Sequence, residues 1–197
     1  MTDSGFLKLK SGMLKLLRTD LDPRLTYHRP EHTEDVLRHV ERIATAENIT
    51  DKRLLHLMRI AALFHDTGFL RTYKGHEEES CIIMRERLGS GILDESELKI
   101  IDGMIMATKI PQTPATLPEK VICDADLDYL GRDDFDSISN TLKKEFMIYG
   151  IIKDDAEWDL LQLDFFNSHH YFTKTSIRER CPVKDRHLES LKRKLVK

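Results

Sequence analysis

Apolar residues recur at intervals of three and four along almost the whole chain, which is the spacing of one face of an α-helix. The stripes predict helices over residues 6–20, 30–48, 52–66, 76–88, 98–109, 119–131, 133–150, 153–172 and 185–197. The sequence shows neither the alternation typical of half-buried strands nor the turn signals of β-hairpins. The pattern therefore predicts an all-α, single-domain helical bundle over residues 1–197.

Local signals mark the ends of several of these helices. Pro30 suits the first turn of a helix, Asp51 suits an N-cap, and Asp94 with Glu97 resembles a capping box. Gly68 is expected to end the helix of residues 52–66. A stiff connector is predicted from Pro111, Pro114 and Pro118.

Composition narrows the kinds of protein that fit. The 197 residues are 40% hydrophobic and 33% charged, as in folded globular proteins, and the net charge of −3 gives no general attraction to nucleic acid. No apolar run approaches the roughly 20 residues of a membrane helix, and the N-terminus lacks the apolar stretch of a secretory signal. The scattered, odd set of Cys81, Cys123 and Cys181 favours reduced thiols in the cytoplasm. We expect no membrane partner and no nucleic acid partner, and a homodimer remains open.

One apolar run ends in two groups that resist burial. The segment from Ile60 to Phe64 is followed directly by His65 and Asp66. Burying both groups is costly unless both are satisfied, and a divalent cation would satisfy them. In the alternative interpretation, Asp66 is only a helix-terminal carboxylate and His65 a hydrogen-bonded core histidine.

Further metal-ligating groups occur on other predicted helices. His32 lies four residues before Val36, on the apolar face of its helix, and therefore points inward. Asp124 and Asp126 belong to a third helix. Helical bundles build metal sites from facing helices in this way, and a shell of imidazoles and carboxylates favours Mn, Fe, Co, Ni or Zn over calcium.

Three stretches carry a family resemblance. YHRPEHTEDV, LFHDTGF and DADLDYLG occur in this order, over about residues 25–135, and the pattern resembles the HD-domain superfamily of metal-dependent phosphohydrolases. The resemblance implies an HD-type helical fold, with residues 136–197 as C-terminal helices that carry no assigned motif. It implies the metal ligands His32, His65, Asp66 and a later aspartate, for which Asp126 is favoured over Asp124. Mg²⁺ is a candidate for the open positions.

The same resemblance suggests catalytic residues. The first histidine of YHRPEH, His28, matches the proton donor of the YHNxxH motif in cyclic-nucleotide phosphodiesterases; otherwise it is a surface or capping group. His76, in GHEEES, is expected to serve the substrate or the leaving group from a loop that can swing over the metal, or else to be an exposed helix-start residue. Glu77 would act as a base or orient a partner. No His-His pair lies between His76 and Asp126, which favours one tightly bound metal over two.

Three residues are candidates for substrate binding. Lys109 could reach a phosphate or simply complement a helix end. Tyr129 and Arg132 lie in DYLGRDD, which resembles the DYxxRD of deoxynucleoside triphosphate hydrolases; alternatively they are a packed tyrosine and a surface ion pair. A later pair, His169 and His170, is expected at the surface.

These expectations together point to one activity. The chain is predicted to hydrolyse a phosphate ester of a nucleotide or another small metabolite, with a metal-activated water as nucleophile and a histidine as general acid. Two alternatives remain: a regulatory nucleotide-binding HD module without turnover, and a di-iron HD-type oxygenase.

Overall fold

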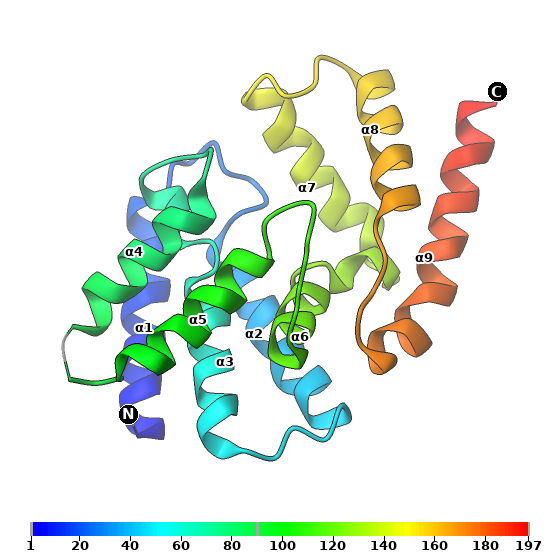
Figure 1. Cartoon of the computed structure of the whole chain (residues 1–197). Helices are drawn as coiled ribbons and strands as arrows, with labels where there is room; N and C mark the ends of the chain where they lie inside the picture. The colour runs from blue at the N-terminus through cyan, green and yellow to red at the C-terminus, as the bar shows by residue number, and fades with distance from the viewer. Residues whose placement is uncertain (1, 90, 197) are drawn as a thin grey trace.

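Helices make up the regular structure of the computed structural model, which describes residues 2–89 and 91–196 (Figure 1). In chain order they are α1 (Asp3–Asp20), α2 (Pro30–Ala46), α3 (Lys52–Phe64), the 3₁₀ helix η1 (Thr67–Leu70), α4 (His76–Leu88), α5 (Glu95–Ala107), α6 (Leu117–Asp126), the 3₁₀ helix η2 (Asp128–Gly131), α7 (Phe135–Ile148), α8 (Asp155–Ser168) and α9 (Lys174–Leu195). Within these described ranges no residue forms a β-strand. The predicted all-α bundle is confirmed.

Several predicted helix ends are confirmed. Pro30 is the first residue of α2. The carboxylate of Asp51 caps α3 by accepting hydrogen bonds from the backbone N–H groups of Arg53 and Leu54. Asp94 and Glu97 form the capping box of α5. The sequence signals at these positions are local, which is why they could be interpreted without knowledge of the fold.

Other boundaries differ from the expectation. Helix α3 ends at Phe64, and Gly68 lies beyond it in η1, where a Cβ atom would come within 1.9 Å of the carbonyl oxygen of His76. Gly68 is therefore required by close packing and does not end the helix. Pro118 belongs to the first turn of α6 and not to the connector. The last helix begins at Lys174, where Thr173 caps it, and not at residue 185.

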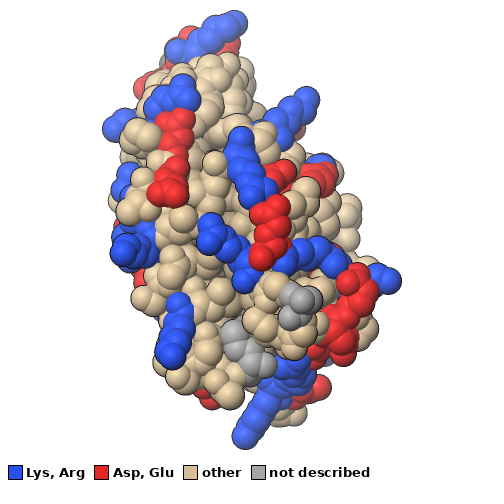
Figure 2. Space-filling view, turned by 90° about the vertical axis from the view of Figure 1, so that its left-hand side faces the viewer, with Lys and Arg blue, Asp and Glu red and all other residues tan. Residues whose placement is uncertain are grey.

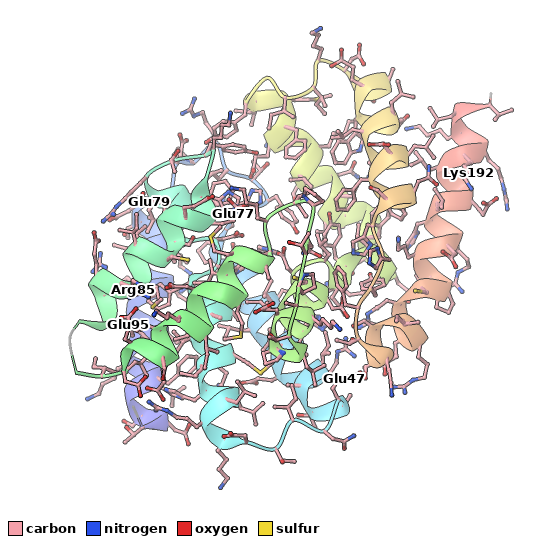
Figure 3. The ribbon with its side chains drawn as sticks, viewed as in Figure 1. Glu47, Glu77, Glu79, Arg85, Glu95 and Lys192 are labelled. Atoms are coloured by element: carbon pink, nitrogen blue, oxygen red, sulfur yellow. The ribbon has the colours of Figure 1, made fainter. Side chains whose placement is uncertain are left out.

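Most of the apolar side chains form one core. Helix α2 packs on α3 and α6, α5 packs on α3 and α6, and α4 lies against η1 and α5. The fully buried Met58, Phe64 and Ile105 belong to this core. Ion pairs at 3.0 Å between Arg85 and Glu95 join α4 to the start of α5 at the edge of the bundle (Figure 3).

A smaller, aromatic core lies under the C-terminal helices. Its buried members are Tyr27, Leu127, Tyr129, Leu130, Phe135, Phe166 and Tyr171. Helix α9 packs on η2 and α8, and Figure 1 shows α8 and α9 on the side opposite α1 and α4. Because α6 continues into η2, the two cores meet where α6 ends.

The exposed surface carries charges of both signs. On the face shown in Figure 2, the Lys and Arg side chains are interspersed with those of Asp and Glu. Local ion pairs balance many of these charges, as where Arg71 contacts both Glu79 and Glu86 at 2.6 Å. Of the helices in the described part of the chain, none is long and apolar enough to cross a bilayer.

Candidate metal centre and its cavity

Helix ends bring four potential metal ligands to one point. His32 lies in the first turn of α2, His65 directly follows α3, and Asp66 comes next. Asp126 is the last residue of α6. Because α2 packs on both α3 and α6, these three helix ends converge, and the side chains are 86–99% buried.

The four side chains present their ligand atoms to one another. His32 Nε2 lies 3.0 Å from Asp126 Oδ1, 3.3 Å from His65 Nε2 and 3.4 Å from Asp66 Oδ2. His65 Nε2 lies 3.2 Å from Asp66 Oδ2 and 3.5 Å from Asp126 Oδ1. Asp66 Oδ2 is buried and has no hydrogen-bond donor among the described residues.

This spacing fits a transition-metal ion. Ligand atoms that each lie about 2.0–2.2 Å from one cation are about 3.0–3.5 Å from one another in tetrahedral or octahedral geometry. The separations among His32, His65 and Asp66, 3.2–3.4 Å, agree with that geometry, and Asp126 Oδ1 lies 3.0 and 3.5 Å from the two imidazole nitrogens. A metal site of this kind also accounts for the buried Asp66 oxygen that has no hydrogen-bond donor, and it ordinarily has both nitrogen and oxygen ligands. His32, His65 and Asp66 could therefore hold a metal ion.

The orientation of His65 is fixed by its own helix and by α4. Its Nδ1 lies 2.9 Å from the carbonyl oxygen of Ala62, so this nitrogen carries the proton and Nε2 is left with a lone pair. The hydroxyl of Ser80 donates to the carbonyl oxygen of His65 at 2.7 Å and accepts from the backbone N–H of Gly68 at 2.8 Å. The ligand is thus held at the backbone and at the ring.

The cluster attracts positive charge. Burial by itself lowers the pKa of His65, but the negative charges of Asp66 and Asp126 beside it raise the pKa well above its usual value. Burial raises the pKa of Asp126, but hydrogen bonds from His32 and His65 bring it down to about 2. Two carboxylates beside two imidazoles therefore stabilise added positive charge, whether as protons or as a metal ion.

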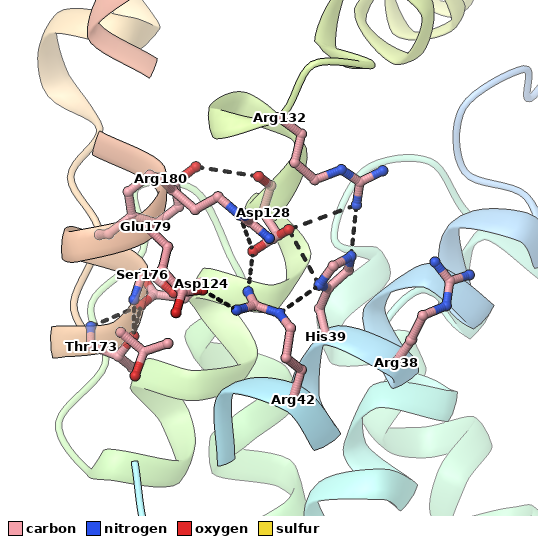
Figure 4. Close-up of polar contacts among 12 residues, drawn as sticks. Arg38, His39, Arg42, Asp124, Asp128, Arg132, Thr173, Ser176, Glu179 and Arg180 are labelled. Atoms are coloured by element: carbon pink, nitrogen blue, oxygen red, sulfur yellow. Dashed lines mark hydrogen bonds and ion pairs between the residues drawn. The ribbon is translucent and has the colours of Figure 1, made fainter. Parts of the chain in front are cut away.

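Asp124 has a different position from Asp126. Its carboxylate accepts hydrogen bonds from the backbone N–H groups of Phe172 and Thr173, at 2.9 and 2.8 Å, and from the Thr173 hydroxyl at 2.7 Å. It therefore connects α6 to the residues just before α9, near Thr173 and Ser176 in Figure 4. The geometry agrees with the preference for Asp126 as the candidate ligand.

His28 lies beside the cluster and is held by a carboxylate from α7. Its Nδ1 is 2.5 Å from Oε1 of Glu145, and Oε2 of Glu145 accepts from the backbone N–H groups of Tyr27 and His28 at 2.9 and 3.2 Å. The hydroxyl of Tyr73 also donates to Oε1. Burial lowers the pKa of His28, but the hydrogen bond and charge of Glu145 outweigh it, and the pKa is raised. Glu145 is itself completely buried.

His76 also packs against Phe69, close to His28. The Phe69 ring stacks against the imidazoles of His28 and His76, with centroids 4.1 and 4.0 Å apart. His76 Nε2 is 3.6 Å from Asp66 Oδ1 and 3.6 Å from Glu77 Oε1. His76 is the first residue of α4, as expected of a helix beginning near it, and its backbone packs on Gly68; the predicted swing of the preceding loop stays a prediction.

A cavity of about 450 Å³ opens from this cluster. His28, Asp66, His76, Glu77 and Asp126 line its polar end, and Tyr129 lines the wall next to them. Figure 3 shows Glu77 at the inner end of α4, whereas Glu79 lies at the outer edge of the molecule. Apart from Lys109 and Arg132, the predicted residues of the site are thus brought together at or next to one cavity.

Lys109 and Arg132 are the exceptions. Lys109 forms an ion pair with Glu78 at the surface. Arg132 contacts Asp35 and Asp134 at 2.6 Å, within a network in which the buried Asp128 joins α2 to α9 (Figure 4). The structure brings neither guanidinium nor ammonium group into the cavity, so substrate contact by these two residues has no structural support.

His169 and His170 differ in their exposure to solvent. His170 is exposed as expected. His169 is not a surface group, because both ring nitrogens are buried, its ring stacks on Phe165, and burial lowers its pKa to about 3. Neither lines the cavity.

Glu145 and the residues of α7 and α8 that wall the cavity were not predicted from the sequence. A signal for Glu145 was available: it continues the apolar stripe of Ile138, Leu142 and Tyr149, and a carboxylate on such a face needs a buried partner. Nothing local indicated that this partner would be His28, more than a hundred residues away. Comparison of the chain with protein-family models, with curated proteins and with solved structures finds no significant match.

Proposed function

We propose that this protein is a metal-dependent phosphohydrolase of the HD type, which cleaves a phosphate ester of a nucleotide or another small metabolite. The observation that carries the proposal is the group of His32, His65 and Asp66 at the polar end of a cavity, with ligand atoms 3.2–3.4 Å apart and with Asp126 Oδ1 3.0 Å from His32 Nε2. His32, His65, Asp66 and Asp126 would hold the cation. When bound there, a divalent transition metal would polarise a phosphoryl oxygen and acidify water.

The protein's own groups then account for the proton transfers. In the hydrolysis, the oxygen of water forms a bond to phosphorus, and the ester P–O bond breaks with its electron pair on the leaving oxygen. His28 is the proposed donor to that oxygen, and the carboxylate of Glu77, which lines the cavity, is the proposed acceptor of the proton that the water loses. Glu145 engages Nδ1, so the proton is transferred from Nε2, and the hydrogen bond to Glu145 favours the protonated ring by raising the pKa of His28.

His76 and Glu77 complete the polar end of the cavity. Stacking on Phe69 fixes the ring of His76, with Nε2 between the carboxylates of Asp66 and Glu77. In this position His76 can orient the phosphoryl group or the leaving group. The free thiols of Cys81, Cys123 and Cys181 support a cytoplasmic location as part of the same proposal.

Metal analysis combined with a turnover screen tests the proposal. Wild-type protein and the Asp66→Ala variant are purified without added metal, and each is assayed for bound metal and for phosphate release from nucleotides and sugar phosphates. His170→Ala is the matched control, because His170 is exposed and outside the cavity. We expect metal and turnover in wild type and His170→Ala, and loss of both in Asp66→Ala.

Two results would change the assignment. Equal metal content in wild type and Asp66→Ala would remove Asp66 from the site. If no phosphoester is turned over while one of them binds tightly, a regulatory nucleotide-binding module is the better description.

A further inference from the structure

The cavity has an apolar end that the metal cluster does not use. Beyond the polar residues it is walled by Leu142 and Phe146 from α7 and by Trp158, Leu161 and Phe165 from α8. Phe146 and Trp158 meet edge to face at 5.9 Å, so the wall is built from packed aromatic side chains. The volume of the whole cavity, about 450 Å³, is within the range of small-molecule sites, about 300–1,000 Å³.

The charge of the lining is the second observation. Among the described residues that line the cavity there is no Lys or Arg, whereas Asp66, Glu77, Asp126 and Asp164 are carboxylates. The two cations that the sequence suggested for phosphate binding, Lys109 and Arg132, are paired with carboxylates elsewhere. Proteins that bind several phosphate groups ordinarily supply Arg or Lys to each of them.

From this combination we infer that the substrate is an ester with a single phosphoryl group on an aromatic or branched apolar alcohol, and not a nucleoside polyphosphate. The inference rests on the proposed function. The phosphoryl group occupies the polar end, and the apolar body of the alcohol lies against α7 and α8. Burial of that body against the Leu, Phe and Trp side chains favours binding.

Trp158 provides a readout of binding that does not depend on turnover. It is the only tryptophan of the chain and it lines the apolar end. We propose titrations of the purified protein with benzylphosphonate, methylphosphonate and inorganic tripolyphosphate, followed by tryptophan fluorescence. Benzylphosphonate should bind at least about tenfold more tightly than methylphosphonate because its ring is buried, and tripolyphosphate should bind most weakly.

Two neighbouring leucines of α8 give a matched pair of variants. Leu161 lines the cavity and is 39% exposed, whereas Leu160 is 58% exposed and does not line it. Both changes to alanine are therefore compatible with folding. Leu161→Ala should weaken benzylphosphonate binding about tenfold, and Leu160→Ala should leave it unchanged. Leu161→Lys should weaken benzylphosphonate binding and strengthen tripolyphosphate binding.

Turnover of benzyl phosphate, ribose 5-phosphate and ATP by the wild type separates this inference from the function on which it rests. Hydrolysis of benzyl phosphate to benzyl alcohol and inorganic phosphate, faster than that of the other two, would support both. Tighter binding of tripolyphosphate than of benzylphosphonate, or equal effects of Leu161→Ala and Leu160→Ala, would overturn the inference whatever the turnover. If no ester is cleaved but the binding preference holds, hydrolysis is refuted and the ligand class stands.

Discussion

At the scale of single residues, the chemistry of the site depends on which histidine ring nitrogens already form hydrogen bonds within the protein. The side chain of His65 is 1% exposed and its Nδ1 is engaged by the carbonyl of Ala62, so only Nε2 is free for a ligand. His28 is similarly committed at Nδ1, by Glu145. In both rings one nitrogen is fixed by the fold, and the chemistry is left to the other.

His76→Ala tests whether this residue serves the substrate or the metal. General acid or base catalysis contributes about 10²–10⁴-fold, and we expect kcat to fall by a factor in that range while metal content remains near that of the wild type. His65→Ala is the comparison, because it should lose metal and activity together. Loss of metal from His76→Ala in proportion to its activity would instead indicate a dinuclear centre, with Asp66 between two ions.

Glu145→Gln tests the pair with His28. The pKa of His28 is raised in the folded protein and that of Glu145 is lowered. The pair therefore stabilises the fold fully between about pH 4.5, the ordinary pKa of glutamate, and about pH 6.5, the ordinary pKa of histidine. This stabilisation is lost as the pH rises through the raised pKa of His28, and as it falls through that of Glu145.

The variant should therefore lower the free energy of unfolding by about 1.5–3 kcal/mol near pH 6, with a smaller loss at higher pH. NMR titration should show a lower pKa for His28 in Glu145→Gln than in wild type. The pH dependence of kcat should shift to lower pH in the same variant. Glu78→Gln, at an exposed carboxylate on α4, is the control. An unchanged His28 titration would show that Glu145 does not position this ring.

At the scale of elements, the site is assembled from helix termini. The ends of α3 and α6 and the first turn of α2 supply the candidate ligands, and the first residue of α4 supplies His76. The spacing between α4 and the end of α3 depends on Gly68, whose missing side chain lets η1 lie directly on the backbone of His76.

Gly68→Ala tests this contact. Its Cβ would be placed 1.9 Å from the carbonyl oxygen of His76, and such overpacking costs about 1–3 kcal/mol or more. We expect a lower midpoint in urea denaturation and a loss of activity through displacement of His76. Gly12→Ala is the matched control, because nothing lies within 4 Å of its Cβ in α1, and there alanine should stabilise the helix by about 1 kcal/mol. Similar midpoints for the two variants would contradict this role.

At the scale of the whole molecule, the cavity lies where two cores meet. The larger core consists mainly of residues from α1 through α6, and the aromatic core mainly of residues from η2 and the C-terminal helices. Candidate ligands come from three helices of the first group, and Glu145 and the apolar wall come from the second. A bound cation would therefore link α2, α3 and α6 in the folded state only.

Metal removal should accordingly reduce global stability. A ligand at about 100 times its Kd stabilises the folded state by about 2.7 kcal/mol, so treatment with a chelator should lower the Tm in scanning calorimetry, and added Mn²⁺ or Zn²⁺ should restore it. Asp66→Ala should show the same Tm with and without the chelator. A wild-type Tm that does not respond to chelation or to added metal would argue against a tightly held ion.

The sequence by itself determined the helices, several of their caps and the identity of the candidate ligands. The apolar stripes and capping residues act within one or two turns, so they can be interpreted locally, as the boundaries of α2 and α5 show. His32 and His65 were expected to face inward because each lies on an apolar face, and both do. The distinction between Asp124 and Asp126 needed the fold, because it depends on the backbone of residues 172 and 173.

Only the tertiary structure decided how the cavity is completed. Glu145 reaches His28 across more than a hundred residues, and α7 and α8 supply an apolar wall although their sequences carry no recognisable motif. Lys109 and Arg132 had side chains suited to phosphate, yet nearby carboxylates hold them elsewhere. Long-range pairing of this kind depends on how helices pack, and packing depends on the shape of the whole core and not on any short stretch of sequence.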